Sequence, residues 1–172
     1  MKKLAVLVLV VLLAVMPFAS LAETVTWEEV GAAFVDTLGL EGDFVALEDM
    51  GLAFWLPAGM EYVEPSEEDA AAGRYAIFAD DECALVIDAV KVEGMTLDQA
   101  YENAVANGMF EPEIVNINGI DALTYKNEAI NGGCVVLVDT NCNMIIFTFT
   151  PIEGENAEYA YAVISSSIMP LE

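Results

Sequence analysis

The stretch of sequence that decides the fold runs from Glu113 to Thr150 and reads EIVNINGIDALTYKNEAINGGCVVLVDTNCNMIIFTFT. Three turn signals divide it into four short apolar segments: Asn118-Gly119, Asn131-Gly132-Gly133 and Asp139-Thr140-Asn141. An Asn-Gly pair between two alternating segments is a strong hairpin signal, because both residues tolerate a positive φ. Pro151 follows the last segment and cannot continue a hydrogen-bonded ladder. The stretch therefore predicts an antiparallel meander of four strands.

The flanking sequence predicts two further strand pairs and three helices. The strand pairs are residues 43–47 with 52–56, and residues 74–79 with 84–92. The helices are residues 26–38, 97–107 and 155–169, and the first two begin with the spacing of a capping box. In the second helix the side chains expected to face inward are Leu97, Ala100, Tyr101, Ala104 and Val105. The acidic segment 64–69 is expected to be a connection with at most one helical turn.

Two strands of the meander are apolar at every position rather than at alternate ones, namely residues 135–138 and 144–147. A sheet with one face in water alternates more cleanly, so both faces of this sheet are expected to be covered. The three helices are available to cover them. We therefore predict an α+β protein in which a three-layer α/β/α sandwich is built around a single, mainly antiparallel sheet, with residues 23–172 forming one domain.

The N-terminal 22 residues have the pattern of a secretory signal peptide. Lys2-Lys3 precede an apolar run from residue 4 to residue 16, and Ser20-Leu21-Ala22 form a cleavage pattern of small residues. A retained membrane anchor would need about 20 apolar residues, but this run is shorter and is interrupted by Pro17. The sequence thus predicts export and cleavage after Ala22, giving a secreted or envelope-associated protein.

The charge of the chain excludes two classes of partner. All 29 acidic residues lie beyond residue 22, whereas two of the five basic residues are Lys2 and Lys3, so the formal charge of the exported part is 3 − 29 = −26. Such a surface repels phosphate backbones and anionic lipid head groups. We therefore expect no nucleic-acid binding and no binding to an anionic membrane surface.

Three cysteines allow at most one disulfide: Cys83, Cys134 and Cys142. Cys134 and Cys142 flank one turn, but if Val138 faces Asn143, then Cys134 faces Phe147 and is too far from Cys142 for a disulfide. Cys83 with Cys142 is the preferred pair, because each lies next to a turn. The alternative is three thiols that are buried as small hydrophobic groups.

The sequence contains no histidine. Ser-His-Asp and Cys-His nucleophile pairs and the usual zinc ligand sets are therefore excluded. The run Ser165-Ser166-Ser167 falls inside a predicted helix, where hydroxyl groups ordinarily bond to the helix itself. Trp27, Trp55 and Tyr62 are candidates for lining a ligand groove, although packing in the core or at a sheet edge is the preferred interpretation.

Carboxylates are the one plentiful reactive group. The candidate metal ligands fall in two clusters: Asp80, Asp81 and Glu82 at a hairpin tip, and Glu67, Glu68 and Asp69 after Glu64 in the acidic segment. Neither cluster has the spacing of a calcium-binding loop, and charge runs at turns are usually solvated. A calcium site assembled from separate loops nevertheless stays open. A carboxylate pair facing across a cleft, as in a glycosidase, is a further alternative.

Three segments of the chain resemble the PsbP-like fold, from about Gly51 onward: LAFWLPAGM at residues 52–60, VNINGIDALTY at 115–125, and IIFTFTP at 145–151 with AVISSSI at 162–168. That fold is named for the extrinsic photosystem II protein and is shared with a yeast Ran-binding import factor and many exported bacterial proteins. The resemblance implies an α/β/α sandwich. Residues 23–50 are not part of the resemblance, and we expect them to be an N-terminal addition. Members with assigned roles mostly bind proteins, and those that bind metals rely partly on histidine, so no functional residue is carried over.

These observations favour a non-enzymatic binding or accessory domain without a cofactor. Its expected contacts are surface loops and the outer edge of the sheet, and its expected partner is a protein or another envelope component. The alternative hypothesis is a calcium or small-ligand binder that uses the acidic loops.

Overall fold

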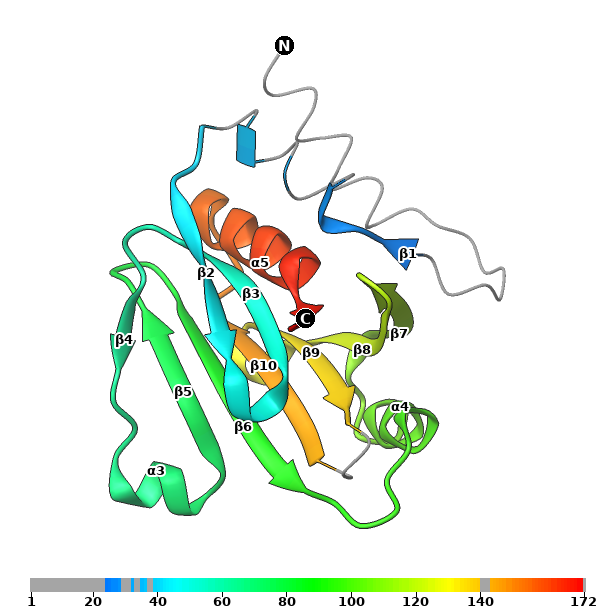
Figure 1. The fold of residues 1–172 in the computed structure, drawn as a ribbon. Helices are drawn as coiled ribbons and strands as arrows, with labels where there is room; N and C mark the ends of the chain where they lie inside the picture. Colours follow the sequence, from blue (N-terminus) through cyan, green and yellow to red (C-terminus); the bar gives the residue numbers. More distant parts are fainter. Residues whose placement is uncertain (1–23, 29–31, 33–34, 37–38, 140–142, 172) are drawn as a thin grey trace.

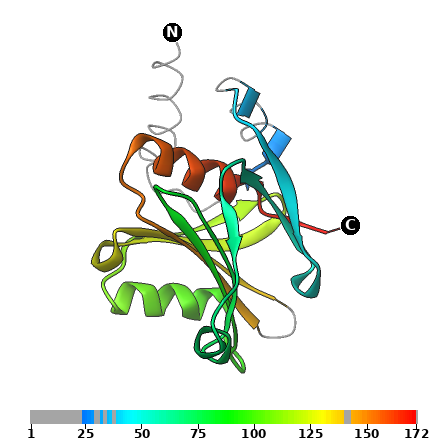
Figure 2. The same cartoon turned by 90° about the vertical axis from the view of Figure 1, so that its left-hand side faces the viewer.

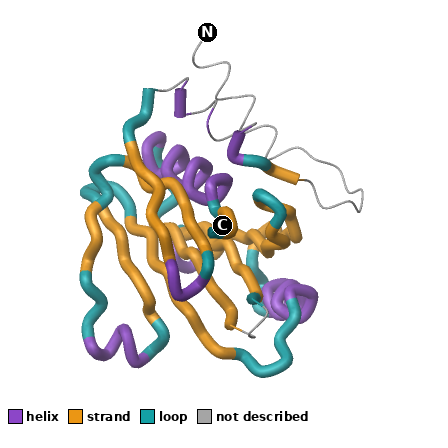
Figure 3. Tube along the Cα trace, in the orientation of Figure 1, coloured by secondary structure: helices purple, strands orange, loops and turns teal. Residues whose placement is uncertain are grey.

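The computed structural model describes residues 24–28, 32, 35–36, 39–139 and 143–171. In this part of the chain, strands far outnumber helices (Figure 3). The main sheet has eight strands in the order β1-β7-β8-β9-β10-β6-β5-β4. Of the predicted helix at residues 26–38, residues 26–28, 32, 35 and 36 are described, and the rest lie outside the described residues.

The predicted meander is confirmed. Its strands are β7 (Phe110–Ile117), β8 (Ile120–Asn127), β9 (Gly132–Val138) and β10 (Asn143–Thr150), and they pair antiparallel in chain order. Asn118 and Gly119 have φ of 48° and 88°, which is the doubly left-handed turn that the Asn-Gly signal predicts. The assumed β9–β10 register was wrong by one residue, because Val138 faces Met144 and Cys134 faces Thr148.

The meander continues into the predicted hairpin of β5 (Arg74–Ala79) and β6 (Ala84–Lys91), because β6 pairs with β10. A short strand, β4 (Glu61–Val63), pairs with β5 and ends the sheet on that side. The other end is β1 (Thr24–Val25), which pairs parallel to β7. The two end strands have three and two residues and were not predicted, since such short segments show no periodicity.

The expectation of a single sheet was wrong. The predicted strands 43–47 and 52–56 form the hairpin β2 (Gly42–Leu47) and β3 (Leu52–Pro57), which joins β11 (Met169–Pro170) in a separate three-stranded sheet. In Figure 1 this hairpin crosses in front of the strands of the main sheet. The first four residues of β3 are all buried, so this strand packs as a layer and does not extend the main sheet. Phe54 makes edge-to-face contacts with Phe78 of β5 and Phe147 of β10, each with ring centroids 5.7 Å apart.

The three-layer α/β/α arrangement is confirmed. Figure 2 shows α5 (Glu155–Ser167) and α4 (Leu97–Ala106) on opposite sides of the main sheet. On the α5 side, the helix and β3 cover a large core that includes Phe54, Leu85, Ile87, Phe147 and Ile164, all with 0% exposure. On the α4 side, the buried cluster consists of Ala100, Ala104, Leu123 and Val136. The two faces of the sheet are therefore covered very unequally.

The helix predictions hold with small corrections. The capping box of Thr96 and Gln99 begins α4 as expected, and the acidic segment forms one short helix, α3 (Glu67–Ala71). Val105 was expected to face inward but is 51% exposed, because it lies about 100° round the helix from Ala104 and outside the buried stripe. The last helix ends at Ser167, two residues before the predicted end, and the chain continues into β11.

Two polar side chains fasten the C-terminal end of α5 to the rest of the protein. Ser167 is fully buried, and its Oγ accepts the Trp55 backbone N–H at 2.8 Å while donating to the Ile164 carbonyl at 2.7 Å. Asn118 Nδ2 donates to the carbonyls of Ser166 and Ile168 at 2.9 and 2.8 Å. Asn118 Oδ1 accepts the backbone N–H of Trp27 at 2.5 Å. The turn between β7 and β8 thus caps α5 and holds the N-terminal segment.

We predict that Asn118→Gly lowers the free energy of unfolding by about 2 kcal/mol, because two carbonyls at the end of α5 lose a donor while the left-handed turn is kept. Asn131→Gly is the matched control, since Asn131 has nearly the same φ of 47° and the hydrogen bonds found for it come from its backbone. Urea denaturation of both variants measures the difference. Equal stability of the two would show that the Asn118 side chain does not fasten α5.

Candidate functional site

The two acidic clusters of the sequence lie far apart. Glu67, Glu68 and Asp69 lie in α3 just before β5, whereas Asp80, Asp81 and Glu82 follow β5 directly. A six-residue strand is about 20 Å long, and α3 lies at the opposite end of β5 from the β5–β6 turn (Figure 1). The structure therefore does not combine the two clusters into one site.

Several of these carboxylates already serve the fold. Asp80 Oδ1 accepts the backbone N–H groups of Glu82 and Cys83, both at 2.8 Å. Asp69 completes a capping box with Ser66 and forms an ion pair with Arg74 at 2.9 Å. The Ser66 hydroxyl, and to a lesser extent the charge of Arg74, lower the pKa of Asp69. Within the described residues, no three acidic or cysteine side chains come together as metal ligands.

The three aromatic candidates do not line one groove. Trp55 is 5% exposed and packs against Trp27 at a centroid distance of 6.0 Å, and Trp27 also makes an edge contact with Phe44 at 5.4 Å. Tyr62 lies on β4, contacts Phe78 at 5.7 Å and is 58% exposed. Packing in the core and at an edge is therefore the correct interpretation for the two tryptophans.

The serine run has the structural role expected of it. The hydroxyl groups of Ser165 and Ser166 donate to helix carbonyls, as does that of Ser167. These bonds lie one turn back along α5, where a hydroxyl satisfies an acceptor without leaving the helix surface. The run supplies no activated nucleophile.

Cys83 and Cys134 are both free and buried, as in the alternative of buried thiols, so the pair Cys83–Cys142 does not form. Pairing along β6 and β10 explains this result. Ala84, next to Cys83, faces Thr150, whereas Asn143, next to Cys142 in the sequence, faces Lys91 at the far end of both strands. Seven residues of strand separate these ends by about 23 Å, well beyond the reach of a disulfide. Cys142 itself lies outside the described residues.

An exposed apolar area follows the β4 end of the main sheet. We define the β4 edge surface as Tyr62 and Val63 of β4 with Ile77 of β5 and Val86 of β6. Val63, Ile77 and Val86 stand opposite one another across three strands and share the face on which α4 packs, whereas Tyr62 points to the other face and contacts Phe78. Val63 is 46% exposed, and Ile77 and Val86 are half-buried, because α4 packs over β8, β9 and β10 instead.

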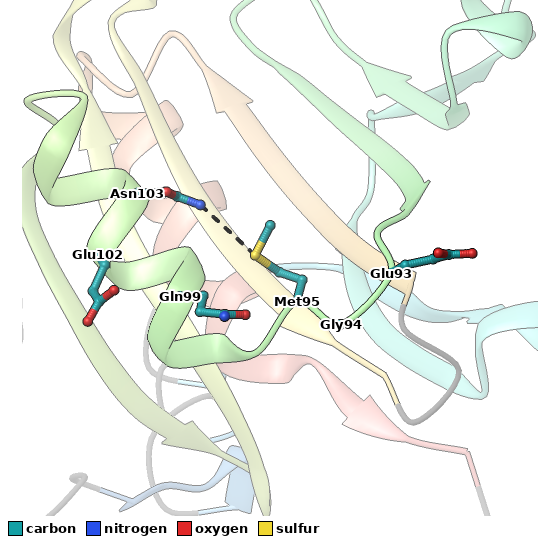
Figure 4. Close-up of a pocket in the computed structure, with 6 residues that line it drawn as sticks. All are labelled: Glu93, Gly94, Met95, Gln99, Glu102 and Asn103. Atoms are coloured by element: carbon teal, nitrogen blue, oxygen red, sulfur yellow. Dashed lines mark hydrogen bonds between the residues drawn. The ribbon is translucent and has the colours of Figure 1, made fainter.

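A second feature is a hollow along α4, in two parts. The outer part has a volume of about 310 Å³ and is lined by polar and acidic side chains together with Met95 (Figure 4). The inner part, about 170 Å³, lies between α4 and the sheet and is lined mainly by apolar groups, including Leu123, Val136 and Ile146. Sequence reasoning missed this hollow, because the amphipathic pattern of α4 predicts that its inner face is packed but not how tightly.

In the part of the chain that the structure describes, no helix is long and apolar enough to cross a membrane.

We predict that calcium and magnesium chlorides at equal millimolar concentrations raise the melting temperature equally. Both cations screen the net charge, but the described carboxylates form no cluster that would prefer the larger ion. Differential scanning fluorimetry measures the two shifts. A larger shift in melting temperature with calcium than with magnesium would reveal a calcium-selective site and contradict this prediction.

Alkaline pH should destabilise the protein between about pH 9 and pH 12. Burial, reinforced by the charge of Asp80, raises the pKa of Cys83 to about 11, and burial raises the pKa of Tyr161 to about 12. Because these groups ionise at lower pH in the unfolded chain than in the folded protein, stability is complete below the unfolded pKa values and falls as pH rises toward the folded ones. Urea midpoints across this range measure the fall, which should be less steep in Cys83→Ala. Parallel curves for the variant and the parent protein would refute the contribution of Cys83.

Comparison with known proteins gives structural matches only. No protein-family model matches the sequence, and the search of curated proteins gives no match. The solution structure of the cyanobacterial PsbP (CyanoP) from Synechocystis sp. PCC 6803 matches with a TM-score of 0.52 and 15% identity, covering 75% of this chain and 92% of that one. A crystal structure from Bacteroides thetaiotaomicron matches with a TM-score of 0.51 and 12% identity, covering 76% of this chain and 49% of that one.

The Ran-binding protein Mog1p of Saccharomyces cerevisiae is a weaker match, with a TM-score of 0.42 and 12% identity over 77% of this chain and 97% of that one. At such identities the likeness concerns the fold and not the site. The helix on each face of the sheet (Figure 2) and the match over nearly all of CyanoP agree with the resemblance drawn from the sequence. The chain has the PsbP-like fold.

Proposed function

We propose that this protein is an exported, non-enzymatic accessory domain that binds a protein partner along the β4 edge surface. The observation that carries the proposal is the exposure of Tyr62 and Val63, at 58% and 46%, on the strand that ends the main sheet. An end strand offers backbone N–H and C=O groups to a further strand, and its alternating side chains contact the partner on both faces. Tyrosine is enriched among residues that dominate binding energy.

The surroundings of β4 indicate the chemistry of the partner. Glu61 lies within β4, Glu64 follows it, and Glu67 and Glu68 are exposed on the adjoining α3. Basic side chains near this edge are few in the described part, and Arg74 is already paired with Asp69 and Asp88. A basic, partly apolar segment of the partner would complement this acidic edge, whereas an acidic segment would be repelled by it.

Separate observations support the proposed export and the proposed non-enzymatic role. The sequence begins with the pattern of a signal peptide and has no histidine. In the described residues the carboxylate clusters are separated by the length of β5, and the serines are bonded into α5. These features support a binding role over turnover.

Photo-crosslinking tests the partner site. A benzophenone amino acid placed at Tyr62 should capture a discrete protein from envelope extract of the producing organism, and 0.5 M NaCl should weaken the capture because the attraction is largely ionic. The same probe at Phe110, which is 47% exposed at the other end of the sheet, is the matched control. Identical adducts from both positions, or no adduct from Tyr62, would refute the site.

A double variant tests the same surface without a probe. Tyr62→Ser with Val63→Thr removes exposed apolar area but keeps reasonable strand formers, so the melting temperature should change by less than about 3 °C. Affinity for the captured partner should fall at least about tenfold. Val105→Thr, a change at a similarly exposed valine on α4, should leave affinity unchanged. Undiminished affinity in the double variant would exclude the β4 edge surface.

A further inference from the structure

The space beneath α4 exists because the helix presents small side chains to the sheet. Ala100 and Ala104 are 7% exposed and face Leu123 and Val136. The methyl group of an alanine fills less of the space between a helix and a sheet than a leucine side chain would. Tightly packed protein interiors seldom leave such space unfilled. The result is the inner hollow of about 170 Å³.

Methionines gather around this space. The sequence has eight methionines, of which Met1 and Met16 belong to the predicted signal peptide. Of the remaining six, Met95, Met109 and Met144 all line the inner hollow. Methionine is unbranched and adapts to irregular shapes, which suits a cavity that must accept an apolar guest or close without one.

The two parts of the hollow differ in polarity. The side chains that line the inner part include no charged group, whereas the residues that line the outer part include Gln99, Glu93 and Glu102, the two carboxylates pointing away from each other on opposite sides of it (Figure 4). Met95 and Asn103 line both parts, and Asn103 Nδ2 lies 4.0 Å from Met95 Sδ at the boundary. The apolar part thus adjoins the polar part at two shared side chains.

We propose that this hollow binds a small cationic amphiphile, with its alkyl chain between α4 and the sheet and its cationic head group in the outer part, near one of the two carboxylates that line it (Figure 4). A volume of 170 Å³ holds about six methylene groups, if each occupies roughly the 30 Å³ of a water molecule in the liquid. The formal charge of −26 beyond residue 22 favours a cation over a fatty acid. This site is separate from the β4 edge surface and does not depend on the proposed function.

The test uses octyltrimethylammonium and octanoate, which have equal chain lengths and opposite charges, at millimolar concentrations below micelle formation. The protein is labelled with ¹³C at its methionine methyl groups, and NMR follows each signal during titration. The cation should shift the signals of Met95, Met109 and Met144, while Met50, Met60 and Met169 serve as internal controls. Equal binding of octanoate, or shifts spread over all six methionines, would overturn the proposal.

Two pairs of variants test the two halves of the site separately. Ala104→Leu fills the inner space and should abolish the saturable shifts, whereas Ala106→Leu, the same change on the exposed side of α4, should leave them intact. Glu93→Gln with Glu102→Gln should weaken cation binding about two- to fivefold, as expected for solvent-exposed charge pairs. Glu128→Gln, at the distant β8–β9 turn, should not weaken it. Binding that survives Ala104→Leu in a folded protein would disprove the site.

Discussion

The burial of one face of the main sheet beneath α5 and β3 is the interaction on which the rest of the structure depends. Phe54 of β3 reaches Phe78 and Phe147 of the sheet, and complete burial of such a side chain contributes about 1.5–3 kcal/mol. Polar bonds from Ser167 and Asn118 then fix where α5 ends, each worth about 1 kcal/mol. Apolar packing therefore supplies most of the stability of this layer, and the hydrogen bonds determine its position.

The opposite face of the sheet is covered sparingly, and both proposed binding sites involve it. α4 packs with two alanines over the middle strands and leaves the half formed by β4, β5 and β6 open. A layer held by few buried groups opens locally at a lower free energy than a densely packed one. The molecule thus combines a well-packed face with a sparsely covered one, and the hollow beneath α4 and part of the β4 edge surface lie on the sparsely covered face.

The sequence predicted the elements whose signals are local. Asn118-Gly119 set the first reversal of the meander, and Thr96 with Gln99 set the start of α4. What it could not predict depends on pairing between distant segments. β11 has two residues and forms only because α5 brings it beside β3, so the second sheet has no signal of its own. The observed β9–β10 register differs from the predicted one by one residue, because the alternating pattern does not fix the turn length when both faces of the sheet are buried.

The candidate sites were predicted less well than the fold, for a related reason. The acidic clusters were conspicuous in sequence, yet Asp80 and Asp69 bond to their own neighbours. The hollow beneath α4 was inconspicuous, because an alanine on the buried stripe of a helix fits close packing as well as it fits a cavity. The exposure of Tyr62 was equally hard to predict, because it depends on the strand order, which places β4 at one end of the eight-stranded sheet.

Native-state hydrogen exchange tests the unequal division between the two faces most directly. Amides of β9, β10 and the second half of α5 should exchange through global unfolding, with free energies of opening that fall as denaturant is added. Amides of α4 should exchange through local opening at a lower free energy that barely depends on denaturant. If α4 instead exchanged with the same free energy and the same denaturant dependence as β9 and β10, the loosely packed face described here would not exist.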